Sequence, residues 1–163
     1  MSLALERLRA LGFELPPVPP AVGTYVPAVS VGNLVFVSGH GPFEGGRLLR
    51  HGKLGGSVSL PEGRAAAELV MLNALASLQA EIGDLDRVER IVKLLGMVAS
   101  EPTFTRQPEV IDAASDLLVN VFGERGRHAR SAVGMVVLPF DIPVEIEMIV
   151  QVQPTVAARD RRD

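Results

Sequence analysis

Residues 126–139 read "GRHARSAVGMVVLP", and this stretch places a charged Arg130 at the start of an otherwise apolar segment. The next apolar segment, "VEIEMIVQV" at 144–152, alternates apolar residues with Glu145 and Glu147. Successive side chains of a strand point to opposite faces, so both segments are predicted to be strands with one apolar face each. If the two strands are neighbours, their carboxylates could approach Arg130 on a shared face.

Two interpretations of Arg130 remain open at this stage. In the first, Arg130 and Glu145 form a structural ion pair at a sheet edge or subunit interface, where arginine is common. In the second, the guanidinium binds a ligand carboxylate through two parallel hydrogen bonds. Small neighbours, which include Ala129 and Ser131, would leave room for such a ligand.

The rest of the chain supplies further elements. The predicted helices are 2–11, 60–82 and 108–122. The predicted strands are 24–31, 34–38, 87–100, 129–139, 144–152 and a short one near 47–49. Ser59 with Glu62 forms a capping-box pattern before the long helix, and Gly83 follows its end. We expect an N-terminal helix and proline-rich arm over 1–19, one domain over 20–153 and a polar tail over 154–163.

The order of these elements predicts an α+β domain, a mixed sheet with its two main helices on one face. No helix remains to cover the other sheet face. Association of copies through that face is therefore expected.

Composition excludes several functions. The chain has 163 residues, a net charge of −3, 4% aromatic residues and no cysteine. These values argue against a general nucleic-acid binder, disulfides and thiol chemistry, and fit a cytoplasmic protein. The sequence has no uncharged apolar stretch of 18 residues, so no membrane span is expected. No metal site is expected, because the histidines lack metal-ligand spacing: His40, His51 and His128.

Several stretches resemble the Rid (YjgF-type) superfamily of reactive-intermediate deaminases, once labelled L-PSP endoribonucleases. They are "GNLVFVSGHGP", "GDLDRVERIVKLLGMV", "SDLLVNVFGERGRHARSAVGMVVLP" and "VEIEMIVQV", and the likeness runs from about residue 20 to 152. The N-terminal helix and the wording "GRHARSAV" are similar to a longer, less-characterised branch. The resemblance implies a chorismate-mutase-like fold, a homotrimer with a barrel-like core, and ligand clefts between subunits.

The resemblance also implies a chemistry without cofactors. Arg130 would bind the carboxylate of a 2-imino or 2-enamino acid, and Glu145 would orient or activate the water that hydrolyses it to a 2-keto acid and ammonia. The expected substrate-binding residues are Tyr25, Ser38, Gly39, Asp112 and Ser131. Glu147 is expected to be an exposed or ion-paired strand residue.

Asp112 departs from the family pattern, which often has asparagine there. An anionic aspartate would repel a carboxylate ligand. Either Asp112 is turned away, or the substrate carries a positive group, or imine hydrolysis is weak in this chain. Two alternatives follow. One is a non-catalytic trimeric sensor of small carboxylates. The other is an RNA-cleaving protein that holds phosphate on a basic cluster, against which the negative net charge argues: Arg125, Arg127, His128 and Arg130.

Overall fold

A five-stranded mixed sheet forms one layer of the molecule in the computed structural model, which describes residues 2–154. The strand order is β1-β2-β7-β5-β6. Only β5 and β6 run parallel, whereas the other neighbours are antiparallel. The strands are β1 (Ala28–Val31), β2 (Leu34–His40), β5 (Val88–Ala99), β6 (Ala129–Met135) and β7 (Val144–Val152), and β3 (Phe43–Glu44) pairs separately with β4 (Arg47–Leu48).

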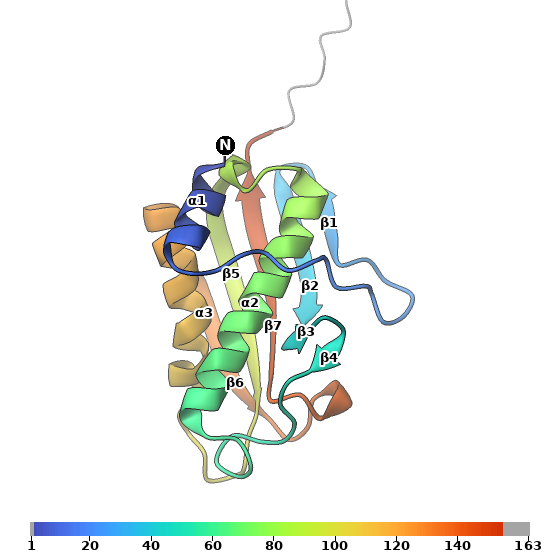
Figure 1. The fold of residues 1–163 in the computed structure, drawn as a ribbon, viewed down its shortest axis with the longest axis vertical. Helices are drawn as coiled ribbons and strands as arrows, with labels where there is room; N and C mark the ends of the chain where they lie inside the picture. Colours follow the sequence, from blue (N-terminus) through green and yellow to red (C-terminus); the bar gives the residue numbers. More distant parts are fainter. Residues whose placement is uncertain (1, 155–163) are drawn as a thin grey trace, which may run out of the picture.

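Three α-helices lie on one face of this sheet (Figure 1). They are α1 (Leu3–Ala10), α2 (Leu60–Ile82) and α3 (Gln107–Phe122), and short 3-10 turns η1 (Leu85–Arg87), η2 (Gly123–Gly126) and η3 (Pro139–Asp141) complete the chain. The predicted α+β class, mixed sheet and helix placement are confirmed. The core lies between α2, α3 and the covered sheet face.

Helix α2 begins and ends where its sequence signals indicate. The Ser59 hydroxyl and the Glu62 side chain form the capping box, and Gly83 follows the helix with a φ of 85°. The helix is long and apolar enough to cross a membrane by length and composition alone, but most of it is buried inside the domain. We therefore describe α2 as the core helix of the fold.

Helix α1 is attached to the domain at its first turn. The backbone amides of Leu3 and Ala4 donate hydrogen bonds to the Asp86 carboxylate, at 2.7 and 2.9 Å. A carboxylate at this position accepts from amides that have no partner inside the helix. Because Leu8 is also buried in the main core, α1 packs as part of the domain.

The second face of the sheet is not covered by any described element. Its register places Val29, Phe36, Ile149, Met97 and Val133 on this face. Val29, Phe36 and Val133 are exposed large apolar side chains. The expected uncovered apolar face is thus present within residues 2–154.

Two expectations about strands need correction. The first strand begins at Ala28 and not at residue 24, directly after Pro27, whose ring removes a ladder donor. The last two strands are not neighbours, because β5 lies between β6 and β7. Of the predicted tail over 154–163, residues 155–163 lie outside the described residues.

Candidate functional site

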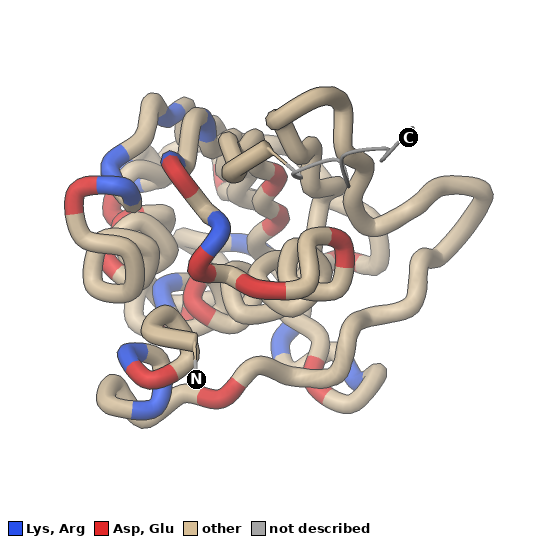
Figure 2. The backbone as a smooth tube through the Cα atoms, turned by 90° about the horizontal axis from the view of Figure 1, so that it is seen from above, with Lys and Arg blue, Asp and Glu red and all other residues tan. Residues whose placement is uncertain are grey.

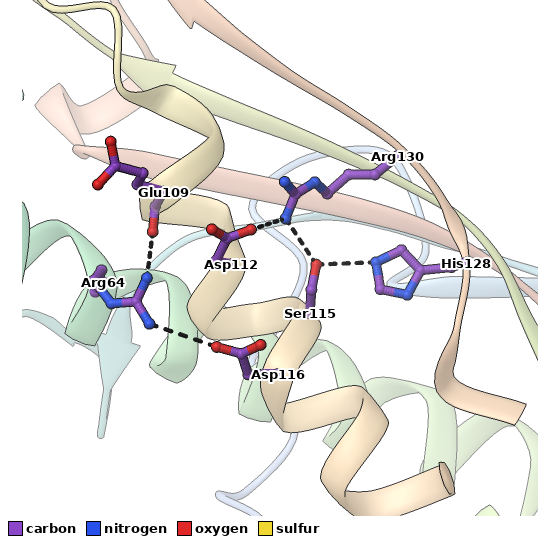
Figure 3. Close-up of polar contacts among 7 residues, drawn as sticks. All are labelled: Arg64, Glu109, Asp112, Ser115, Asp116, His128 and Arg130. Atoms are coloured by element: carbon purple, nitrogen blue, oxygen red, sulfur yellow. Dashed lines mark hydrogen bonds and ion pairs between the residues drawn. The ribbon is translucent and has the colours of Figure 1, made fainter. Parts of the chain in front are cut away.

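Arg130 lies on the edge strand β6 and points toward the helices (Figure 3). Its Nη1 donates to Asp112 Oδ1 at 2.8 Å and to Ser115 Oγ at 3.0 Å, both on α3. The expected approach of Glu145 to Arg130 is wrong. The register puts Arg130 opposite Leu94 and Glu145 opposite Met97, three residues apart, so the two side chains lie on opposite faces of the sheet.

One edge of the Arg130 guanidinium has no partner in the described part of the chain. Both hydrogen bonds and the ion pair to Asp112 use Nη1, and none uses Nε or Nη2. The Nε–Nη2 edge is one of the two that can donate a parallel pair of bonds to a carboxylate. With its side chain 23% exposed, Arg130 can still take an acidic ligand while Asp112 and Ser115 fix its orientation.

A chain of hydrogen bonds continues from Arg130 through Ser115 to His128. The distance from Ser115 Oγ to His128 Nε2 is 3.0 Å, and His128 Nδ1 lies 2.6 Å from the Gly126 carbonyl oxygen. Burial first, and then the positive charge of Arg130, lower the pKa of His128 below its ordinary value, although the Gly126 bond opposes this. His128 therefore favours the neutral form that can accept a proton.

The predicted basic cluster is not a single phosphate-binding surface. Arg125 donates to the backbone carbonyl oxygens of Val88 and Asp86, and Arg127 pairs with Glu124. Figure 2 shows basic and acidic residues intermixed along the described backbone, without a continuous basic stripe. This arrangement does not favour nucleic-acid binding.

A second group of candidate residues lines a cavity of about 590 Å³ at the other end of the strand order. The cavity is bordered by the proline-rich arm, β2, η3 and β7, and Tyr25, Ser38, Gly39 and Glu145 are among its lining residues. Arg130, Asp112 and Ser131 are not among them. In a single chain, the predicted site is therefore divided into two parts with the sheet between them.

A β-bulge positions the polar part of this cavity. The pairing of β2 with β7 shifts register between Val37 and His40, which gives Ser38 and Gly39 an irregular place in the ladder. A Cβ at Gly39 would collide with the Glu145 carboxylate, so glycine allows Glu145 to lie against the β2 backbone. The Ser38 hydroxyl donates to the Val26 carbonyl oxygen at 2.7 Å, which connects the arm to β2.

Tyr25 and His40 lie on the borders of the same cavity. Tyr25 is 49% exposed, and its hydroxyl accepts a bond from the Val22 amide at 3.3 Å. His40, for which the sequence indicates no role, is buried. Its Nδ1 lies 2.6 Å from the Ser38 carbonyl oxygen, and its Nε2 lies 2.8 Å from Ser77 Oγ. Burial lowers the pKa of His40. Its two partners assign it a role in holding β2 against α2.

Ser131 does not join either part of the site. It points to the uncovered face, where its hydroxyl accepts a bond from Lys93 Nζ at 2.8 Å. His51 is exposed in the glycine-rich segment. Glu147 is exposed, as expected.

Burial, and then the negative charge of Glu147, raise the pKa of the Glu145 carboxyl. Below its ordinary pKa of 4.5 the group is protonated in both the folded and the unfolded chain, so ionisation costs no stability there. As pH rises through the raised folded-state pKa, the folded chain carries an unfavourable buried charge. Glu145 is thus a carboxyl that can exchange protons closer to neutrality than an exposed one.

We predict that Glu145→Gln stabilises the fold at neutral pH. The gain should be about 0.5 kcal/mol, a small value because solvent still reaches the carboxylate. The gain should vanish near pH 4, where the wild-type carboxyl is protonated. Urea unfolding at both pH values measures it, with Glu44→Gln on the exposed surface as the control. Equal gains at the two pH values would contradict the assignment.

Neither Ser115 nor the contact of His128 with the Arg130 site is among the features expected from the sequence. A signal was present: Asp112 and Ser115 are three residues apart on a helix, and His128 and Arg130 are two apart entering a strand. These spacings place each pair on one face of its element. Only the packing of α3 beside β6 brings the two pairs together.

The fold, with three helices on one face of a mixed sheet, defines the chorismate-mutase-like class of α+β proteins. A model of the YjgF/chorismate mutase-like family, which carries the label endoribonuclease, matches residues 5–150. The chain belongs to this family.

Individual relatives agree with this membership. Protein TCP17 of Trypanosoma cruzi is 44% identical over 88% of this chain and 91% of its own. The crystal structure of protein Atu1372 from Agrobacterium tumefaciens, described as of unknown function, is 45% identical with a TM-score of 0.87 and 93% coverage of both chains. A Shewanella oneidensis protein labelled an endoribonuclease is 37% identical with a TM-score of 0.89, covering 91% of this chain and 99% of its own.

Proposed function

We propose that this protein is a cytoplasmic, cofactor-free hydrolase that converts reactive 2-imino and 2-enamino acids to 2-keto acids and ammonia. We further propose that it acts as a homotrimer with its sites between subunits. The observation that carries the proposal is the Nε–Nη2 edge of the partly exposed Arg130 side chain, which has no partner among residues 2–154. This edge matches the carboxylate that all these substrates share.

The division of the site supports an intersubunit location. Arg130 lies on the helix side of edge strand β6, whereas the cavity with Glu145 borders β2 and β7. One chain cannot bring the two to one ligand, because its own sheet separates them. A second copy that places its β2–β7 end against this β6–α3 edge would complete a site, and the uncovered apolar face gives such copies a surface for association.

Each part of the divided site has a chemical role in this proposal. The arginine of one copy holds the substrate carboxylate and leaves the imine carbon beside the cavity of the next. Glu145, with its raised pKa, orients the attacking water there. Asp112 lies beside the same guanidinium and favours a substrate that is positively charged, as an iminium is.

Small-ligand binding occurs elsewhere in the family. The Escherichia coli member TdcF, 22% identical to this chain, has been solved with bound serine, an amino acid with a carboxylate. For this chain, a non-catalytic carboxylate sensor is the alternative. The Asp112–Arg130 pair disfavours simple keto acids as ligands of such a sensor, since a carboxylate near the ligand weakens their binding.

The test uses 2-aminoacrylate generated in place by a dehydratase, or a branched-chain imine from an amino-acid oxidase. We expect the protein to accelerate loss of the imine signal with matching release of ammonia and keto acid. No acceleration together with a thermal shift on keto acids would favour the sensor and reject the hydrolase. Sedimentation of the same sample should show three copies; a monomer would contradict the intersubunit site.

A further inference from the structure

We propose that Ser115 and His128 form a proton relay to the substrate held by Arg130, with Ser115 at the substrate and His128 as the base behind it. This inference rests on the proposed hydrolase function and adds two residues to it. Figure 3 shows the three side chains in one hydrogen-bonded row between β6 and α3. The distances are 3.0 Å from Arg130 Nη1 to Ser115 Oγ and 3.0 Å from Ser115 Oγ to His128 Nε2.

The direction of each hydrogen bond follows from the groups involved. The Gly126 carbonyl oxygen only accepts, so His128 Nδ1, 2.6 Å away, carries the ring proton. In the neutral ring, Nε2 is then a lone pair directed at Ser115, whose hydroxyl must donate to it. Arg130 donates to the same oxygen from the other side. A hydroxyl between a base and a cation, with the base oriented by a third group, is arranged to lose its proton.

The surroundings keep His128 in its neutral, proton-accepting form. Burial is the largest cause of its lowered pKa, and the Arg130 charge on β6 adds to it. Lys93 on β5 points to the other sheet face and bonds Ser131. Several other charged groups on the packed elements have partners of their own. Asp112 on α3 pairs with Arg130 on β6, and Glu124 pairs with Arg127 around η2. On α3, Glu109 pairs with Arg106 and Asp116 with Arg64, and Arg125 donates to the Val88 carbonyl oxygen.

The step balances in protons. Water adds to the carbon of the iminium, one of its protons passes to Ser115 Oγ, and the serine proton passes to His128 Nε2. The resulting imidazolium returns a proton by the same route to the amine nitrogen of the carbinolamine. The carbon–nitrogen bond then breaks, the carbinol oxygen becomes the keto oxygen, and its remaining proton leaves with ammonia as ammonium. Glu145 of the next copy orients the water in this scheme.

The experiment compares the pH dependence of kcat for imine hydrolysis in His128→Gln, Ser115→Ala and the double variant. Loss of a general base costs about 10²-fold in kcat, while KM should stay nearly constant because Arg130 still holds the acid. In the wild-type protein, kcat should fall at acidic pH as His128 becomes protonated, with a midpoint below the ordinary histidine pKa of 6.5. This acid limb of the pH profile should disappear in His128→Gln. The double variant should be no slower than either single variant. His51→Gln on the exposed loop is the matched control and should behave as wild type.

The outcomes separate the relay from the function beneath it. A ~10²-fold loss of kcat together with a flattened acid limb of the pH profile in His128→Gln supports the relay. A His128→Gln variant with the wild-type kcat and acid limb overturns the relay and leaves the hydrolase intact. A ~10²-fold loss with an unchanged limb assigns His128 a structural role and also overturns it. Wild-type protein without any acceleration overturns both.

Discussion

Arg130→Gln should lower kcat/KM for 2-imino acid hydrolysis by about 10³-fold. A charge-assisted, bidentate grip on a carboxylate is worth about 2–5 kcal/mol when one partner is truncated, and glutamine offers no charge. The loss should appear mainly in KM if the ion pair binds substrate and transition state equally, and in kcat if it orients the imine for attack. Arg130→Lys should recover little, because an ammonium cannot bond Asp112 and a ligand carboxylate with the same fixed fork.

The Arg130→Gln variant should remain folded. Asp112, left without its partner, has a side chain 45% exposed and can be solvated. We expect a loss of about 1 kcal/mol in unfolding free energy, measured by urea denaturation. Arg127→Gln is the matched control, because Arg127 is an exposed arginine three residues earlier that pairs with Glu124. Arg130→Gln with wild-type kcat/KM would remove Arg130 from the site.

Local signals predicted the elements well because caps and alternation are properties of neighbouring residues. Ser59 and Gly83 bound the long helix, and every second residue from Val144 to Val152 is apolar and buried in β7. The pairing of strands is not local. A strand–helix–strand unit such as β5–α3–β6 tends to place its strands side by side and parallel, because the helix spans their length. Adjacency in sequence instead suggests pairing of β6 with β7, which would put Glu145 on the same face as Arg130, whereas β6 pairs with β5.

The contacts of the candidate site are also non-local. Arg130 and Asp112 were both singled out from the sequence, yet their direct contact depends on how α3 packs on β6. Ser115 gave no signal by itself, since a serine inside a helix is most often a surface residue. The division of the site into two halves cannot be predicted from the sequence spacing of any two residues. It depends on which face and which edge of the sheet each residue occupies.

That division gives a prediction that separates one-chain from two-chain sites. Arg130→Gln and Glu145→Gln should each be nearly inactive alone, but mixing the two chains during refolding should restore activity. A site between copies is competent when its Arg130 comes from the Glu145→Gln chain and its Glu145 from the Arg130→Gln chain. Random assembly of equal amounts satisfies both conditions at roughly one quarter of the sites in a cyclic trimer. The mixture should therefore reach roughly 25% of the wild-type rate.

Two inactive variants can regain activity on mixing only if one site takes its Arg130 from one chain and its Glu145 from the other. Titrating the ratio of the chains should give a maximum at equal amounts, because the competent fraction is the product of the two mole fractions. Co-refolding Arg130→Gln with the double variant Arg130→Gln/Glu145→Gln is the control and should stay inactive, as no chain then supplies the arginine. Mixed oligomers that form, yet show no gain at any ratio, would place Arg130 and Glu145 in separate functions.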